Sequence, residues 1–300
     1  MTKATKAASG STKAKSTAKP AAKQAAGGKA TAKPVPSKPA AAKAKTVAGK
    51  NQPAAKSAKT PAAKAPADTR KAMYGPVTVL NIREHGELRL APAKDHQFAE
   101  SMNSVVLAAA EFPEAALHYP IVFAEADGRW SAYAVTGPSA GKNSFVGKDG
   151  KWLEGAYIPA LIRRYPFVLV ADSSQRSLSL AADLSSSMLK GKSGVKMYED
   201  GKPSKTAANV LRFCVAFDNQ LKASQDLFKR IADTGILVSR RADVTLPDKS
   251  KSAIVGFHVV DEKKLAALDD ETFVSLRKDG VLNLIYCHLW SMRSWKNILA

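Results

Sequence analysis

The sequence predicts an α+β fold in which a mixed or antiparallel sheet is combined with a long amphipathic helix and a C-terminal helical cluster, preceded by a disordered tail. Two observations predict the folded part. Strand signals separated by short turns are mixed with helical ones, and the helical periods gather near the C-terminus instead of alternating strictly with strands. A third observation sets the tail apart, because residues 1–72 contain no aromatic side chain.

The tail, residues 1–72, is a loose alternation of Lys, Pro and Ala that carries 17 Lys or Arg and one acid, Asp68. It has too little apolar area to offset the entropy lost on ordering, so we expect it to be disordered and extended. Its composition resembles the Lys/Ala/Pro-rich tails of linker histones. We expect salt-sensitive binding to nucleic acid or another polyanion without base readout. The alternative is a flexible, solubilising tether.

Residues 73–300 form the predicted globular domain, whose 29 basic and 25 acidic residues nearly balance. A hairpin is expected to join a strand beginning at 121–123 to a strand over 129–136, because Asp127-Gly128 is typical of a two-residue turn. The other elements expected in this half are strands over 77–82 and 87–90 with a turn at His85-Gly86, a helix over 111–119, and a turn over 148–151 flanked by strand signals.

Residues 155–172 combine a short helix with a strand, and a proline opens each of them. Pro159 suits the first turn of a helix, whereas Pro166 forbids its continuation and biases Tyr165 towards extended backbone. The unbroken apolar run over 167–171 predicts a strand covered on both faces. A further strand is expected over 177–184, followed by a polar, glycine-containing loop over 185–204.

The strongest helical period runs from 206 to 233, with Ser204 as its cap and Gly235 as its stop. Its apolar stripe consists of Val210, Cys214, Phe217, Leu221, Ser224, Phe228 and Ile231. Strands are then expected over 236–238 and 253–260 across a charged loop, followed by helices over 261–268, 270–278 and 281–299.

The arginine pair between the helix and the strand of 155–172 is the most distinctive local chemistry. The planar guanidinium forks of Arg163 and Arg164 fit carboxylate or phosphate, so a ligand site over Arg163, Arg164, Tyr165 and Trp152 is one hypothesis. The other, which the sequence favours, is that the arginines form ion pairs with acids on neighbouring elements and stack on aromatic rings.

Two short motifs resemble catalytic or nucleotide-binding signatures. Residues 137–141 match G-x-S-x-G, but turn formers follow them where a nucleophile elbow needs a helix, so we interpret them as a turn. Gly191-Lys192-Ser193 resembles the end of a P-loop, but Ser186 stands where that motif needs its first glycine.

The five histidines are scattered, and none forms an HxH or HExxH pair. His288 lies on an apolar helical stripe, where a hydrogen-bonded core histidine is expected. The sequence therefore predicts no catalytic residue, no metal site and no cofactor. Cys214 and Cys287 are expected to be buried, reduced thiols, which indicates a reducing, cytoplasmic location. No window is apolar enough for a transmembrane helix.

Five stretches in order resemble the SapC family of bacterial proteins. They are Ser101 to Phe112, Tyr119-Pro120-Ile121-Val122-Phe123, Asp149-Gly150-Lys151-Trp152, Tyr157-Ile158-Pro159 with Arg163 to Phe167, and Gly280 to Ser291. The resemblance covers residues 73–300 and leaves the tail outside. It implies an S-layer-associated or transport-related protein and brings no catalytic residues with it.

We therefore expect a SapC-like, non-enzymatic accessory or binding protein that is linked to surface-protein export and whose basic tail binds polyanions. Two alternatives stay open. One is an enzyme whose site assembles around Arg163, Arg164, Tyr165 and a distant acid or His288. The other is a protein tethered to nucleic acid by residues 1–72.

Overall fold

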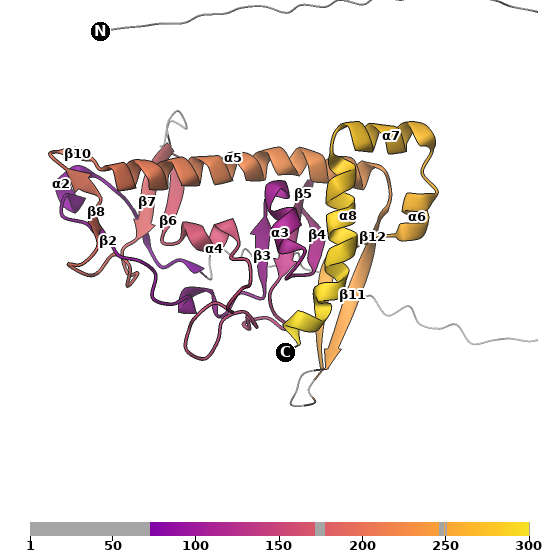
Figure 1. Ribbon diagram of the computed structural model, residues 1–300, viewed down its shortest axis with the longest axis horizontal. Coiled ribbons are helices and arrows are strands. Elements are labelled where there is room, and N and C mark those ends of the chain that lie inside the picture. Colours follow the sequence, from indigo (N-terminus) through magenta and orange to yellow (C-terminus); the bar gives the residue numbers. More distant parts are fainter. Residues whose placement is uncertain (1–72, 172–177, 246–248, 250, 300) are drawn as a thin grey trace, which may run out of the picture. The chain divides into compact units, whose positions relative to one another are not determined.

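The computed structural model describes residues 73–171, 178–245, 249 and 251–299. The predicted disordered tail, residues 1–72, lies outside the described residues. The described chain combines α-helices with antiparallel sheets, and its last three α-helices gather at the C-terminal end (Figure 1). The predicted α+β class is confirmed. None of the helices in these ranges is long and apolar enough to cross a membrane.

The larger sheet has five strands in the order β11-β12-β4-β5-β3, and every neighbouring pair is antiparallel. Its strands are β3 (Ser104–Leu107), β4 (Ile121–Ala126), β5 (Arg129–Val135), β11 (Leu237–Thr245) and β12 (Lys251–Val260). The predicted β4–β5 hairpin is confirmed. Asp127 and Gly128 both have positive φ, 51° and 71°, as a type I′ turn requires.

The β11–β12 hairpin is much longer than predicted. Residues 239–252 were expected to form a charged loop, but ladder pairing continues to Thr245 and Lys251. The part of β11 that was not predicted, residues 239–245, is mostly polar and exposed, and Val244 is its one buried residue. Such a two-stranded ribbon is held by its backbone ladder, which a search for apolar runs does not detect.

The smaller sheet has three strands in the order β1-β7-β6, with β1 (Val77–Val79), β7 (Leu178–Asp183) and β6 (Phe167–Ala171). Strand β6 begins and ends as predicted, but its expected cover on both faces is wrong. Phe167 is buried, the three residues after it are half-buried, and Ala171 is exposed. Strand β6 is an edge strand of this sheet, and its exposure increases towards Ala171.

A turn does follow His85, as predicted, since the Leu88 N–H donates to the His85 carbonyl at 2.9 Å, but a short helix, α2 (Ile82–His85), leads into it instead of a strand. Asn81 caps α2 by accepting a hydrogen bond from the Glu84 backbone N–H at 3.0 Å. Strand β1 consequently pairs with β7, while β2 (Arg89–Leu90) pairs with β8 (Val195–Lys196). The latter strand and the short pair β9 (Tyr198–Glu199) and β10 (Lys202–Pro203) lie inside the predicted 185–204 loop.

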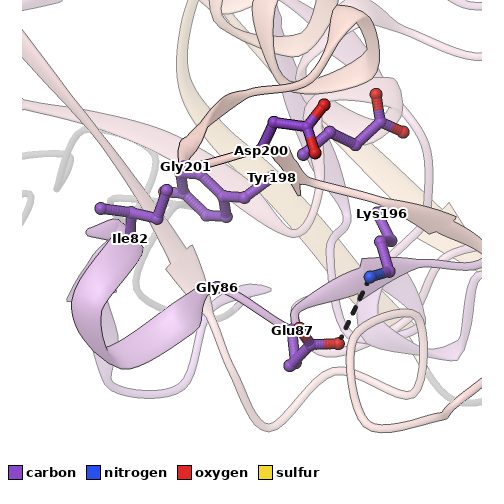
Figure 2. Close-up of a pocket in the computed structure, with 8 residues that line it drawn as sticks. Ile82, Gly86, Glu87, Lys196, Tyr198, Asp200 and Gly201 are labelled. Carbon is purple, nitrogen blue, oxygen red and sulfur yellow. Dashed lines mark ion pairs between the residues drawn. The ribbon is translucent and has the colours of Figure 1, made fainter.

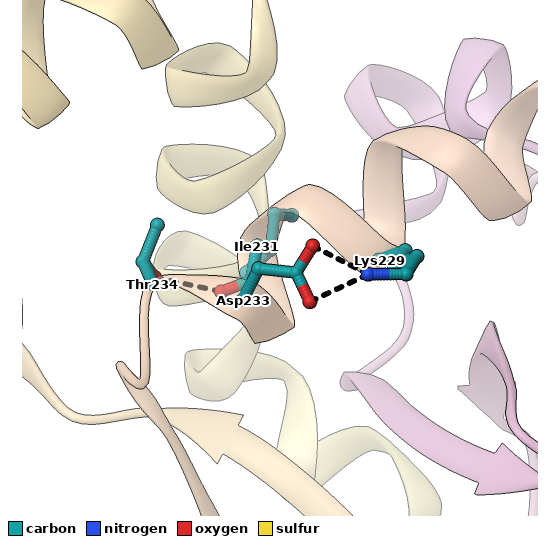
Figure 3. Close-up of polar contacts among 4 residues, drawn as sticks. All are labelled: Lys229, Ile231, Asp233 and Thr234. Carbon is teal, nitrogen blue, oxygen red and sulfur yellow. Dashed lines mark hydrogen bonds and ion pairs between the residues drawn. The ribbon is translucent and has the colours of Figure 1, made fainter.

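Helix α5 (Lys205–Asp233) is the long helix that the period predicted, within one residue at its start. Ser204 caps it through its hydroxyl, and Gly235 follows its end with φ of 73°. Figure 3 shows that end: Lys229 Nζ lies 2.6 Å and 2.8 Å from the Asp233 carboxylate oxygens, and the Thr234 hydroxyl donates to the Ile231 carbonyl at 2.7 Å. Both contacts therefore join groups that belong to the C-terminal end of α5 itself.

The remaining helical elements are short. They are η1 (Gln97–Ala99), η2 (Ala109–Glu111), α3 (Phe112–Ala115), α4 (Ala160–Arg164), α6 (Glu262–Ala266), α7 (Asp270–Lys278), α8 (Val281–Ser291) and η3 (Met292–Ile298). Asp261 caps α6 and Asp269 caps α7, each through its side-chain carboxylate. The final predicted helix, 281–299, divides into α8 and the tighter turns of η3.

Two hydrophobic clusters fill the interior, and α5 contributes to both. Cys214 belongs to the smaller cluster, which includes Phe167 and lies along the three-stranded sheet. Phe217 and Phe228 belong to the larger cluster, together with the inner face of the five-stranded sheet. Figure 1 shows α5 running past β6 and β7 and on towards β4 and β5. A single helix therefore spans both cores.

Candidate functional site at the arginine corner

Arg164, the last residue of α4, is buried with only 3% of its surface exposed. Its Nη1 donates to Asp218 Oδ1 on α5 at 2.7 Å, and its guanidinium lies 5.3 Å from the centre of the Phe217 ring. The Asp218 side chain is 29% exposed, against 2% for that of Arg164. Arg164 is the more deeply buried partner, so its charge would lose more free energy than that of Asp218 if the pair were broken. One of the two arginines has the ion pair that the sequence favoured.

Tyr74 and Cys214 surround the same guanidinium, and both are neutral at pH 7. Burial raises the pKa of Tyr74 to about 12 and that of Cys214 to about 11, although the nearby Arg164 charge opposes both shifts. The Tyr74 hydroxyl donates to the Phe167 carbonyl at 2.9 Å. Asp218 is therefore the anion that balances Arg164 among these neighbours, and Tyr74 links the corner to strand β6.

Arg163 faces a different environment from Arg164. It is exposed, its Nε donates to the Ile158 carbonyl at 2.9 Å, and its Nη2 donates to the Tyr157 hydroxyl at 3.1 Å. Its guanidinium also lies 5.5 Å from the centre of the Phe213 ring on α5. These contacts are the aromatic stacking predicted for the pair, but the two side chains do not converge on one point.

Glu111 is a buried carboxylate that positions α4. One oxygen accepts from the Ala108 N–H at 2.9 Å, and the other accepts from the Ala160 N–H at 2.7 Å and the Tyr157 hydroxyl at 3.0 Å. Ala160 is the first residue of α4, so Glu111 binds one of the free N–H groups at the helix start. Burial, with Glu111 adding to it, raises the pKa of Tyr157 to about 12. A hydrogen-bonded chain therefore runs from Glu111 through Tyr157 to Arg163.

Tyr165 and Trp152 lie at separate points of one row of rings. Tyr165 stacks on Phe98 with centroids 3.8 Å apart and packs against Tyr74 at 5.5 Å. His96 contacts both Phe98, at 5.9 Å, and Trp152, at 5.7 Å. The structure thus connects these two predicted site residues through other rings rather than bringing them together around the arginines.

Residue His288 of α8 is a hydrogen-bonded core histidine, as predicted. Its side chain is fully buried, its Nε2 accepts from the Val260 N–H at 3.0 Å, and its Nδ1 lies 2.8 Å from the Ile121 carbonyl. Because a backbone N–H can only donate, the neutral ring carries its proton on Nδ1 and donates it to Ile121. Burial lowers the pKa of His288 to about 4. The ring therefore holds α8 against β12 and β4 in its neutral form.

Comparison with protein-family models matches SapC over residues 80–298. This range contains the arginine corner, Glu111 and His288. The chain belongs to the SapC family. No curated protein and no solved structure shows significant similarity to it. Membership agrees with the five stretches that suggested it.

One hollow lies near the arginine corner, and another lies near α2. The first, about 490 Å³, is lined by Tyr74, Phe98 and Glu100 among others, and neither arginine lines it. The second, about 370 Å³, is drawn in Figure 2. There Lys196 Nζ lies 3.6 Å from Glu87 Oε2, while Glu199 and Asp200 also line the hollow. Its charged lining is mostly acidic, which does not suit an anionic ligand.

The G-x-S-x-G segment forms a turn, as interpreted from the sequence. Strand β5 precedes it, but bends and turns follow, and the Ser139 carbonyl accepts from the Lys142 N–H. A Cβ on Gly137 would lie 1.7 Å from the Lys142 carbonyl oxygen, so the glycine serves this close approach. Gly191-Lys192-Ser193 is followed by strand β8 and not by the helix of a P-loop. Within the described ranges, no three His, Cys, Asp or Glu side chains are grouped to hold a metal ion.

Sequence reasoning missed Asp218 and Glu111, the two acids on which the corner depends. Asp218 directly follows the stripe residue Phe217 and lies four residues after Cys214, so a carboxylate beside an apolar face was visible in the sequence. Glu111 follows a run of three alanines and gave no comparable signal. Ligand binding by Arg163, Arg164, Tyr165 and Trp152 stays a prediction.

The Arg164–Asp218 pair predicts an asymmetric mutational response. Asp218→Ala leaves a buried cation unpaired and should lower the free energy of unfolding by about 3 kcal/mol. Arg164→Met leaves an anion that reaches solvent and should cost about 1 kcal/mol. The double variant should resemble Arg164→Met. Urea unfolding of the four proteins measures this cycle, and additive single effects would contradict it.

The buried neutral His288 predicts acid sensitivity. The folded-state pKa of about 4 lies below the unfolded value of 6.5, so the unfolded chain binds the proton first. The contribution of His288 to the free energy of unfolding is complete above pH 6.5. It is lost as the pH falls towards 4, by about 3 kcal/mol in all. Urea unfolding at pH 7.5, 6 and 5 should show this slope, and His288→Gln should flatten it. His85→Gln serves as control; an equal flattening there would refute the assignment.

Proposed function

We propose that this SapC protein is a non-enzymatic accessory or binding component whose basic N-terminal segment binds polyanions. The observation that carries the proposal is the separation of charge: residues 1–72 have 17 Lys or Arg and one acid, while the rest of the chain has 29 basic and 25 acidic residues. Clustered lysines bind polyanions by releasing condensed counterions, with no folded site needed.

The interior chemistry supports binding over catalysis. The side chains that could act in a reaction are engaged in internal contacts: Arg164 with Asp218, His288 with two backbone groups, and Glu111 with three donors. Burial raises the pKa of Cys214 to about 11. Its thiol is therefore protonated and poorly nucleophilic at neutral pH.

Surface-protein export in a bacterial cell is the process in which we place this component, because that is the setting the SapC family name implies. The two free cysteines fit work in a reducing compartment such as the cytoplasm, since Cys214 is buried and Cys287 half-buried. The component would there contact one macromolecule through its tail and another through its folded surface.

A second candidate is anion binding at the arginine corner, with or without a reaction. It is favoured by one observation: the buried Arg164 Nε has no hydrogen-bond partner among the described residues. Titration with inorganic phosphate and acetate, followed by the change in urea midpoint, tests it. Stabilisation that Arg164→Met removes supports the candidate, and no stabilisation at any anion concentration excludes it.

The tail proposal predicts retardation of random-sequence duplex DNA by the full chain at low salt. If six to ten lysines engage phosphates, the affinity should fall at least about 1000-fold between 50 and 200 mM salt. Replacing the lysines of 1–72 with glutamine in the full chain should abolish retardation, whereas Lys142→Gln with Lys148→Gln should leave it unchanged. Retardation that survives the glutamine tail would contradict the proposal.

A further inference from the structure

A groove of about 550 Å³ lies between α3 and the α8–η3 segment, and neither arginine of the corner lines it. Its most exposed apolar side chains are Leu117, 69% exposed, and Trp290, 67% exposed. Trp290 also stacks on Tyr286 one helical turn earlier, with centroids 6.5 Å apart. The lining of the groove also includes Arg293, Ser294, Lys296 and Asn297 of η3. Large apolar side chains that gather at one groove mark a binding surface more than scattered ones do.

The wall that carries Leu117 is held rigidly. On one side of it, the Ser294 hydroxyl donates to the Ala116 carbonyl at 3.3 Å; on the other, the Asn297 amide donates to the His118 carbonyl at 2.9 Å. Both donors come from η3. The backbone around Leu117 is therefore fixed with its side chain directed outward, and a ligand would meet a surface that loses little entropy on binding.

The charged residues in the groove lining, Arg293 and Lys296, are both cations. Among the described residues neither takes part in an ion pair, while six other pairs form elsewhere in these ranges. A partner that places carboxylates beside an apolar side chain would match both features of the groove at once.

We propose that the α3–α8 groove docks a segment of another protein in which a large apolar side chain is flanked by Asp or Glu. The chain's own residues 1–72 are excluded by like charge, since they carry 17 Lys or Arg and one acid. A second copy that docked through the same groove would place its own Arg293 and Lys296 against these two cations, which repels it. This docking deepens the proposed binding function by naming the partner chemistry of the folded surface, and it does not depend on the tail.

The test uses the full chain and a fluorescent synthetic peptide with Leu and Phe at helical i, i+4 positions among glutamates. Fluorescence polarisation should show saturable binding that Trp290→Ser weakens at least about tenfold. Leu153→Ser, an equally drastic change at a 56% exposed leucine outside the groove, should change the affinity less than about twofold. Because Trp290 is exposed, its variant should keep the wild-type melting temperature.

Charge reversal provides the second readout. The double variant Arg293→Glu with Lys296→Glu should weaken binding of the glutamate peptide and strengthen binding of a lysine version of the same peptide. Lys142→Glu with Lys148→Glu should do neither. A glutamate peptide with Ser in place of Leu and Phe should lose the Trp290-dependent part of binding. All proteins in this comparison carry the lysine-to-glutamine tail described above, so that the tail's own affinity for acidic peptides does not mask binding at the groove.

Three outcomes would overturn the docking proposal. The first is peptide binding that is equal in wild type and Trp290→Ser. The second is an equal loss in the Leu153 or lysine control variants. The third is tighter Trp290-dependent binding to vesicles of phosphatidylglycerol and phosphatidylcholine than to the peptide, which would assign the groove to a lipid surface. If the wild-type chain fails to retard DNA while the peptide-affinity ratios are as predicted, only the tail proposal is overturned.

Discussion

The ion pair between Arg164 and Asp218 lies where α5 passes from one hydrophobic core to the other. Cys214, one turn before Asp218, packs in the smaller core, and Phe217 packs in the larger one. Arg164 ends the short helix that leads directly into β6, so its guanidinium fixes the smaller sheet to the middle of the long helix. Because the guanidinium is buried, it is stable only while α5 presents the carboxylate. The contact therefore links the smaller sheet to the middle of α5, while Phe217 and Phe228 of the same helix pack against the larger sheet.

The other buried polar groups extend the same arrangement. Glu111 holds the start of α4, and His288 holds α8 to two strands of the larger sheet. Each is a side chain that, in another protein, serves catalysis; here each joins elements distant in sequence. The side chains left for partners lie on the outer surface, notably Trp290 and Leu117 with Arg293 and Lys296. The proposed binding function rests on this outer surface and not on the interior groups.

Local signals predicted much of this fold. The Asp127-Gly128 turn set the β4–β5 hairpin, the apolar period set α5, and the apolar surroundings of His288 indicated a core histidine.

The predictions that failed concern contacts between segments distant in the sequence. Strand β1 pairs with β7 about 100 residues later, which a nearby turn cannot reveal. In the β11–β12 ribbon, backbone pairing continues through polar residues of β11, beyond the apolar segment that predicted a strand. The ligand-site residues Tyr165 and Trp152 were predicted as neighbours of the arginines, but only the fold shows that rings of Phe98 and His96 connect them. The groove arises where α3 meets α8, so no single segment encodes it.

The central claim is that the buried pair couples the two cores through α5, and native-state hydrogen exchange in increasing urea tests it most directly. In the wild type, amides of β6 and β7 should share the opening free energy of amides in β4 and β5. In Asp218→Ala, the β6 and β7 amides should open at a lower free energy than the β4 and β5 amides. The account would be contradicted if the two sheets opened independently in the wild type, or if Asp218→Ala lowered both equally.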